Sequence, residues 1–126
     1  MADILPFRPF YYNTKKAGAL EKLISLPYDV ISPRQREEYY AGSPYNITRL
    51  DFGKEHPSDD ALNNKYTRAA KLFREWADER ILVRQPMGSL YVIEQKFRHQ
   101  GKMTARLGLL TLLKLEEFSA GGIVPH

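Results

Sequence analysis

The sequence contains no cysteine among its 126 residues. Disulfide bonds, catalytic thiols and thiolate-bound metal ions are therefore excluded, and no feature favours an oxidising compartment. The first residues carry an acidic side chain where a signal peptide would be basic, and no continuous apolar stretch follows. We therefore expect a cytoplasmic protein.

Long apolar runs are also missing. The longest run, from Leu107 to Leu113, is interrupted by Gly108 and Thr111, so no segment is predicted to span a membrane and no membrane partner is expected. The hydrophobic fraction of 43% and the charged fraction of 27% are typical of globular proteins. A chain of this length predicts a single domain over residues 1–126 with one core.

Several familiar catalytic signatures are absent. No glycine-rich loop of the P-loop or dinucleotide-binding type occurs, and no serine lies in a nucleophile elbow. His56, His99 and His126 have no spacing that would place two of them together on a metal ion. The sequence therefore predicts no metal site, names no cofactor and leaves open whether the protein is an enzyme.

Basic residues outnumber acidic ones by 19 to 15, which gives a net charge of +4. An excess of this sign is compatible with nucleic-acid binding, and tyrosines with basic neighbours could supply a stacking platform. The signs alternate within residues 34–38 and 71–80, however, as is typical of a mixed, solvated surface. Nucleic acid is therefore the less favoured partner.

The first half of the chain predicts short elements. Residues 4–12 combine aromatic residues with two prolines and predict an extended edge strand, and residues 15–23 predict a short helix weakened by Gly18. Ser32 followed by proline predicts the start of a helix that ends at Gly42. The alternation over residues 47–52 predicts a strand.

The second half predicts longer elements. Apolar residues at steps of three and four predict an amphipathic helix over residues 60–79, capped by residues 58–60. Residues 90–97 and 102–115 predict a long β-hairpin, and leucines on both faces of its second strand predict a buried strand. We expect an α+β fold whose mixed or antiparallel sheet contains this hairpin and is covered by the amphipathic helix, with shorter helices beside it.

Two pairs of residues are candidates for a site. Tyr28 and Asp29 precede a helix start and would place a phenol and a carboxylate at the mouth of the fold, unless Asp29 bonds only to the local backbone. Arg49 and Asp51 would share one face of the predicted strand, as an ion pair or as a substrate clamp.

Three further residues complete the candidate set. Arg34 and Arg36, with the amides of a helix start, would attract a phosphate, although simple helix capping explains the same pattern. His126 follows an apolar and flexible lead-in. The prediction therefore names Asp29, Asp51 and His126 as catalytic residues, and Tyr28, Arg34, Arg36 and Arg49 as substrate-binding residues.

Several segments together carry a resemblance to a known family. They are Leu-Pro-Phe-Arg-Pro at 5–9, Pro-Tyr-Asp-Val-Ile-Ser-Pro at 27–33, Ser-Pro-Tyr-Asn at 43–46 with Arg-Leu-Asp at 49–51, Leu-Tyr-Val-Ile-Glu-Gln at 90–95, Leu-Glu-Glu-Phe at 115–118, and Ile-Val-Pro-His at 123–126. In this order they resemble the domain of unknown function 1015 family of uncharacterised bacterial and archaeal proteins. Members are several times longer, which implies that this chain is an amino-terminal segment on which the remainder packs.

The family resemblance implies no particular reaction. A weaker analogy, to the ParB and sulfiredoxin superfamily, implies nucleotide dependence, because some of its members are nucleotide-dependent kinases of small molecules such as free serine. The leading hypothesis is part of a cytoplasmic enzyme acting on a small anionic or phosphorylated molecule. The alternatives are a nucleic-acid-binding or protein-binding module, and a scaffold segment with no site of its own.

Overall fold

The computed structural model describes residues 3–117 and 119. The fold is α+β, with antiparallel strand pairs throughout, as the sequence predicted. The strands form three two-stranded sheets in place of one continuous sheet. The chain divides into two compact units, which we call the helical unit (residues 10–84) and the hairpin unit (residues 1–9 and 85–126). Among the described helices, none has the length and apolarity needed to cross a membrane.

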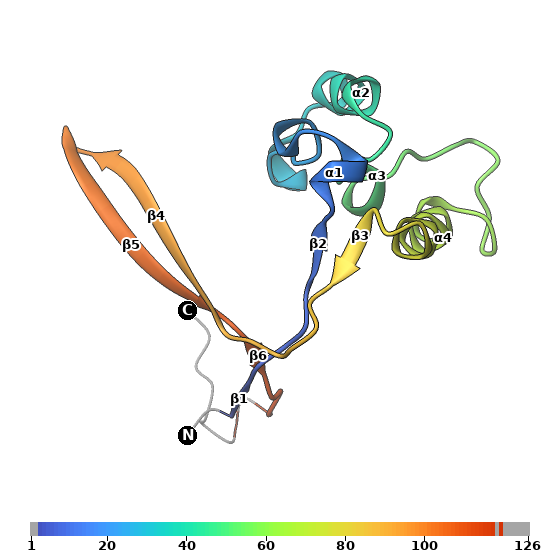
Figure 1. Cartoon of the computed structure of the whole chain (residues 1–126). Coiled ribbons are helices and arrows are strands. Elements are labelled where there is room, and N and C mark those ends of the chain that lie inside the picture. The colour runs from blue at the N-terminus through green and yellow to red at the C-terminus, as the bar shows by residue number, and fades with distance from the viewer. Residues whose placement is uncertain (1–2, 118, 120–126) are drawn as a thin grey trace. The chain divides into compact units, whose positions relative to one another are not determined.

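The helical unit contains one strand pair and most of the helical turns (Figure 1). Its elements are β2 (Phe10–Tyr12), α1 (Thr14–Ala17), the 3₁₀ turns η1 (Leu20–Lys22) and η2 (Tyr28–Val30), α2 (Pro33–Gly42), α3 (Thr48–Asp51), α4 (Lys65–Asp78) and β3 (Leu82–Arg84). Strands β2 and β3 pair antiparallel, with Tyr11 opposite Val83. The beginning and the end of this unit are thereby joined.

Helix α2 begins and ends where the sequence predicted. Ser32 accepts a hydrogen bond from the amide of Gln35, and the Gln35 side chain accepts one from the amide of Ser32. This reciprocal capping box, with Pro33 at the first helical position, explains the sharp start. The helix predicted over residues 15–23 is instead broken into α1 and η1, because Gly18 has a φ of 99° that no helix accommodates.

The predicted strand over residues 47–52 is wrong, because this segment contains the helical turn α3. Its start is set by Asn46, whose side-chain oxygen accepts hydrogen bonds from both the amide and the hydroxyl of Thr48, at 3.1 and 2.8 Å. An alternating pattern six residues long does not outweigh such a local cap. The turn also carries Leu50 towards the core of the unit.

The Asn46 side chain also holds the preceding segment in place. Its amide nitrogen donates to the carbonyl groups of Lys22 and Ile24, at 2.8 and 3.1 Å. The backbone of the next residue, Ile47, donates to the carbonyl of Leu23, which is itself fully buried. Asn46 is only 1% exposed, so its own polar atoms are shielded from water and depend on these bonds.

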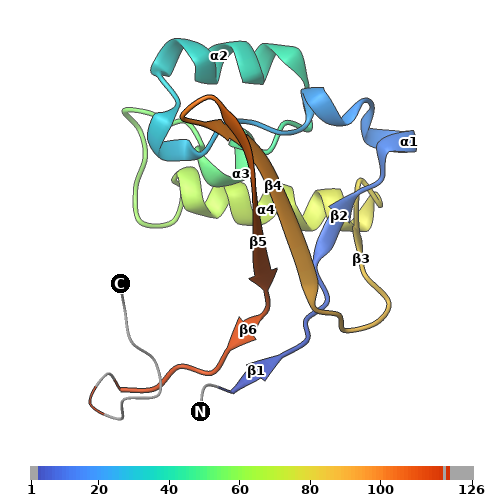
Figure 2. The same ribbon diagram turned by 90° about the vertical axis from the view of Figure 1, so that its left-hand side faces the viewer.

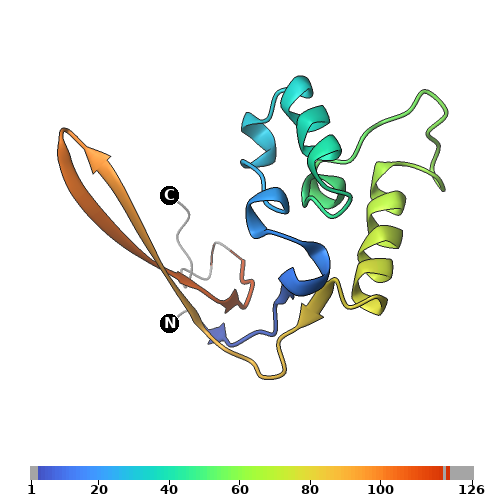
Figure 3. The same ribbon diagram turned by 45° about the horizontal axis from the view of Figure 1, so that its top comes forward.

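Helix α4 begins five residues later than predicted, at Lys65 instead of residue 60. The carboxylate of Asp60 is occupied by a local turn, because it accepts from the amides of residues 62 and 63. Asn64 provides the actual cap by accepting from the amides of Tyr66 and Thr67. Residues 53–64 therefore form an irregular loop between α3 and α4, two helices that pack against each other (Figure 3).

The apolar stripe of α4 delivers Trp76 into the core, where it is 2% exposed. Trp76 packs with Ile81 and Leu82, and its ring lies 5.7 Å from the ring of Tyr45 and 6.2 Å from that of Tyr12. Full burial of such large side chains contributes roughly 2 to 3 kcal/mol each. This cluster joins α4 to the β2–β3 pair.

The hairpin unit contains β1 (Ile4–Leu5), β4 (Tyr91–His99), β5 (Lys102–Leu110) and β6 (Leu112–Leu113). Strands β4 and β5 pair from Tyr91 opposite Leu110 to His99 opposite Lys102, so the predicted hairpin is confirmed (Figure 2). The loop residues Gln100 and Gly101 have φ values of 48° and 78°, as a two-residue type I′ turn requires. The expectation of a buried second strand is wrong for the described residues, because β5 is exposed along its whole length.

We predict that replacing Asn46 with alanine lowers the free energy of unfolding by about 3 kcal/mol, because buried Thr48 and the carbonyl groups of Lys22 and Ile24 each lose a side-chain hydrogen-bond partner. Urea unfolding monitored by Trp76 fluorescence measures this change. The matched control is Asn63→Ala, at an exposed position, which should alter stability by less than about 0.5 kcal/mol. Equal losses in both variants would contradict the role assigned to the buried amide.

A second prediction concerns Tyr12, whose hydroxyl donates to the carbonyl of Tyr45 at 2.8 Å. Partial burial, and secondarily the Asp51 carboxylate, raise the pKa of Tyr12 from 10.0 to about 12. The folded protein therefore keeps this proton where the unfolded chain releases it. The resulting stability is fully present below pH 10 and is lost as the pH rises from about 10 to about 12.

Chemical unfolding between pH 8 and about 12 checks this dependence on pH. The Tyr12→Phe variant should be less stable at neutral pH and should show a shallower loss above pH 10. Tyr11→Phe, on the same strand and 48% exposed, is the control that should retain the wild-type slope. Parallel slopes for wild type and Tyr12→Phe would show that this phenol does not carry the effect.

Candidate functional site

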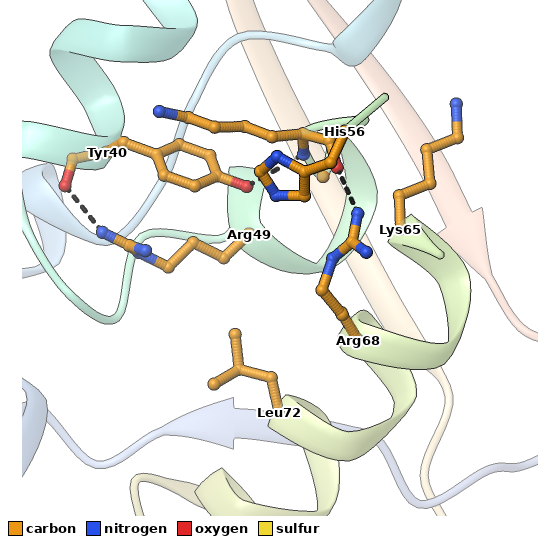
Figure 4. A pocket seen from close by; sticks show the side chains of 8 residues that line it. Tyr40, Arg49, His56, Lys65, Arg68 and Leu72 are labelled. Carbon is orange, nitrogen blue, oxygen red and sulfur yellow. Dashed lines mark hydrogen bonds between the residues drawn. The ribbon is translucent and has the colours of Figure 1, made fainter. Parts of the chain in front are cut away.

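The helical unit contains a hollow of about 190 Å³ whose lining is dominated by basic side chains. We call it the basic hollow, and it is lined by Tyr40, Arg49, Gly53, Lys54, His56, Lys65, Arg68 and Leu72. Figure 4 shows Tyr40 and Arg49 side by side, with His56 close by and Arg68 and Leu72 projecting from α4. The lining residues come from α2, α3, α4 and the loop that joins α3 to α4. No acidic residue is among them.

The ring of Tyr40 holds two cations close together. The guanidinium carbon of Arg49 lies 4.3 Å from the ring centre, and the ammonium nitrogen of Lys54 lies 4.5 Å from it. The Tyr40 hydroxyl also accepts from the backbone amide of Lys54 at 3.3 Å. The electron-rich ring face offsets part of the repulsion between the two like charges.

Arg49 has neutral hydrogen-bond partners in place of a carboxylate. Its Nη2 donates to the carbonyl of Tyr40 at 2.7 Å, and its Nε donates to the carbonyl of Ser43 at 3.3 Å. These carbonyls lie at the carboxyl end of α2, where a positive charge is favourable. The predicted side-by-side placement with Asp51 does not occur, because residues two apart on a helical turn point in different directions. Arg49 therefore brings a positive charge to the hollow, and no carboxylate among the described residues forms an ion pair with it.

Arg68 shapes the loop over residues 53–64. Its two terminal nitrogens bind the carboxylate of Asp59 at 2.6 and 3.0 Å, and Nη2 also donates to the carbonyl of Lys54 at 2.7 Å. The same carboxylate accepts from the amide of His56 at 3.2 Å. Charge-assisted hydrogen bonds from Arg68 hold the pKa of Asp59 at about 2, below its usual 3.8. The loop is thus folded back over the start of α4.

The two lysines of the basic hollow are also paired with carboxylates that lie outside its lining. Lys54 binds Glu37 of α2, and Lys65 binds Glu55 of the loop at 2.6 Å. Hydrogen bonding to these lysines lowers the pKa of both glutamates. Neither glutamate is among the lining residues, so the lining itself contains cationic donors and no carboxylate.

A second hollow, of about 370 Å³, adjoins the first and shares Gly53 and Lys65 with it. We call it the aromatic hollow, and it is lined by Tyr28, Leu50, Asp51, Phe52, Gly53, Lys65 and Tyr66. Partial burial raises the pKa of the Asp51 carboxyl, against the lowering effect of backbone amides from Asp51 itself and Phe52, although the residue as a whole is exposed. Two of the predicted site residues, Tyr28 and Asp51, thus meet in one place.

The remaining predicted residues lie apart from both hollows. Asp29 follows Tyr28 on η2 and is exposed. Arg34 is bound to Glu38 at 3.0 Å on the outside of α2. Arg36 packs over the ring of Phe52 at 5.1 Å and lines neither hollow. His126 lies outside the described residues.

Five polar lining residues are not predicted from the sequence: Tyr40, Lys54, His56, Lys65 and Arg68. Lys65 and Arg68 lie on the polar side of the amphipathic pattern, and Lys54 and His56 lie in a loop, so no sequence motif marks them. The loop over residues 53–64 brings Lys54 next to Arg68, and this return of the chain leaves no periodic pattern that could have been recognised.

Within residues 3–117 and 119, no group of three or more histidine, aspartate or glutamate side chains is arranged to hold a metal ion. The nitrogen donors of the basic hollow are mostly protonated cations, which repel metal ions and attract anions. The chemistry available in this hollow is therefore recognition of negative charge.

Comparison with known proteins gives one family match. Residues 4–126 match the family described as "Protein of unknown function (DUF1015)". The chain belongs to this family. No curated protein and no solved structure matches the chain.

We predict that the Asp59–Arg68 pair makes the fold sensitive to acid. Because the folded-state pKa of Asp59 is depressed from 3.8 to about 2, the stability it contributes is present above about pH 4 and is lost as the pH falls towards 2. Melting temperatures of wild type and Asp59→Asn between pH 7 and about pH 2 measure this, with a shallower acid dependence expected for the variant.

The control for this pair is Glu38→Gln, which removes an ion pair whose side chains are 90% and 61% exposed. Such exposed pairs contribute little, so this variant should follow the wild-type acid profile. If Asp59→Asn also follows that profile, the loop is not held by the carboxylate in the way the geometry indicates.

Proposed function

We propose that the helical unit binds a small anion, with a phosphate group in the basic hollow, as part of an enzyme that acts on a phosphorylated small molecule. The observation that carries this proposal is the lining of the hollow, in which Arg49, Lys54, His56, Lys65 and Arg68 converge and no carboxylate takes part. Clustered guanidinium and ammonium groups are the donors that proteins use for phosphate.

Arg49 is the principal charge in this proposal. Its carbonyl partners fix the guanidinium without neutralising it, whereas Arg68 is held by Asp59 on both terminal nitrogens. At 4 Å and an effective dielectric constant of 20, attraction between two unit charges is about 4 kcal/mol. A phosphate with close to two negative charges therefore gains most from the side of the hollow that Arg49 and Tyr40 form.

Lys54 and Lys65 would strengthen this attraction by leaving their glutamate partners and binding the phosphate instead. Lys54 and Lys65 have side chains that are each 31% exposed, and each is paired with a glutamate whose side chain is more exposed, at 56% and 70%. Exposed pairs of this kind are weak, so a phosphate competes with the glutamates at modest cost. The expected affinity is therefore sensitive to salt.

A catalytic role would fall to Asp51, which lies in the adjoining hollow beside Lys65. A carboxylate of raised pKa is suited to accept a proton from a substrate hydroxyl, as general base catalysis requires. Three further expectations belong to this same proposal. Participation of a nucleotide rests on the analogy to the ParB and sulfiredoxin superfamily, a location in the cytoplasm rests on the composition and the first residues, and a contribution from the remainder of a longer chain rests on the family resemblance.

The proposal predicts saturable binding of inorganic phosphate by the wild-type chain, measured by isothermal titration calorimetry at low salt. Replacing Arg49 with glutamine should weaken that binding by about tenfold or more, because a charge-assisted contact is lost. Lys54→Gln should weaken it by a smaller factor. Arg74→Gln, which changes an exposed arginine of α4 outside the hollow, is the matched control with unchanged affinity.

Each variant is melted without phosphate first, because Arg49 also binds the end of α2. A wild-type chain that shows no saturable heat with millimolar phosphate would refute the proposal. A parallel titration with single-stranded and double-stranded oligonucleotides at two salt concentrations tests the nucleic-acid alternative, for which steep salt dependence is expected.

A further inference from the structure

The aromatic hollow differs in kind from the basic hollow beside it. It is lined by three aromatic rings, from Tyr28 on η2, Phe52 after α3 and Tyr66 in the first turn of α4. Tyr28 is 62% exposed and Tyr66 is 74% exposed, although rings of this size are usually covered. Three segments far apart in sequence thus present aromatic surface to one opening.

The two hollows are contiguous at Gly53 and Lys65, which line both. A Cβ atom added at Gly53 would lie 3.4 Å from the Cβ of Lys65 and 3.5 Å from its carbonyl oxygen. Gly53 therefore lies in close contact with the first turn of α4. Because the two hollows share these lining residues, a ligand longer than a phosphate would reach from one hollow into the other.

The two hollows differ in charge, and this difference determines how a ligand that spans both is oriented. The basic hollow has cations and no carboxylate in its lining, whereas the aromatic hollow contains the carboxylate of Asp51. A phosphate is therefore attracted more strongly to the first hollow than to the second, where the charge of Lys65 is opposed by that of Asp51. The portion of the ligand that lies beside Tyr28 must therefore be uncharged or must offer hydrogen-bond donors to Asp51.

The three rings of the aromatic hollow differ in whether a cation already covers a face. Lys65 lies over the ring of Tyr66 at 5.1 Å, and Arg36 lies over the ring of Phe52 at 5.1 Å. Among the described residues, Tyr28 is not paired with another ring or with a cation. Its exposed face is therefore the surface against which a flat ligand group can stack.

We propose that the ligand of this site is a phosphate ester that carries a flat aromatic ring, with the phosphate in the basic hollow and the ring against Tyr28 and Tyr66 in the aromatic hollow. This inference rests on the proposed function for its phosphate end. It adds the chemical class of the remainder of the ligand and states which part of the ligand each hollow binds.

The test compares three probes on the wild-type chain: inorganic phosphate, phenyl phosphate and cyclohexyl phosphate. The two esters carry the same charge and have rings of similar size, so their difference isolates aromatic stacking from simple burial of apolar surface. Phenyl phosphate should bind roughly three- to tenfold more tightly than cyclohexyl phosphate.

Variants locate this preference. Tyr28→Leu and Tyr66→Leu keep an apolar side chain but remove the ring, and each should reduce the preference for phenyl phosphate over cyclohexyl phosphate. Tyr28→Leu should also leave the affinity for inorganic phosphate unchanged, because Tyr28 contacts no cation of the basic hollow among the described residues. Tyr11→Leu, at a 48% exposed position on β2 outside both hollows, should retain the full preference. Circular dichroism establishes that each variant is folded before titration.

The outcomes separate the two proposals. Phosphate binding with equal affinities for the phenyl and cyclohexyl esters would overturn the aromatic assignment and leave the anion site standing. A phenyl preference that survives in both Tyr28→Leu and Tyr66→Leu would place the ring elsewhere and would also overturn it. Failure of every probe to bind would refute the proposed function itself.

Discussion

The buried side-chain amide of Asn46 is the interaction on which the helical unit depends. It donates to the carbonyls of Lys22 and Ile24 and accepts from the amide and hydroxyl of Thr48, so that its hydrogen-bonding capacity is used in full. Because these bonds start α3, they determine the directions in which Arg49 and Asp51 leave the backbone. One residue then reaches the basic hollow and the other the aromatic hollow.

The positive character of the candidate site follows from where its carboxylates lie. Glu37, Glu55 and Asp59 bind the lysines and Arg68 from positions outside the lining of the basic hollow. These pairs offset the mutual repulsion of Lys54, Lys65 and Arg68 in the folded chain. Arg49 is fixed differently, by carbonyl groups at the end of α2, so its charge stays uncompensated. Anion recognition is therefore built into the same contacts that hold the loop and α2 in place.

The sequence predicted those elements that are fixed by contacts between residues close together in the chain. Ser32 and Pro33 start α2 through contacts within one turn, and the pattern of β4 and β5 predicts a hairpin closed by Gln100 and Gly101. The prediction failed over residues 47–52, where Asn46 folds the chain into a turn through Thr48 and is itself held by carbonyl groups more than twenty positions earlier. It failed again at the start of α4, where Asp60 and Asn64 are both good caps and only the folded loop distinguishes them.

By itself, the sequence determined the α+β class, the hairpin, the limits of α2, the amphipathic stripe that buries Trp76 and the family to which the chain belongs. It also singled out Tyr28, Arg49 and Asp51, which line the two hollows. Only the tertiary structure decided which residues accompany them. Lys54, Lys65 and Arg68 join Tyr40 because an irregular loop returns to α4 through a bidentate ion pair. The spacing of residues in the sequence does not predict such a return. The loop is held by contacts of Arg68 with the carboxylate of Asp59 and with the distant carbonyl of Lys54.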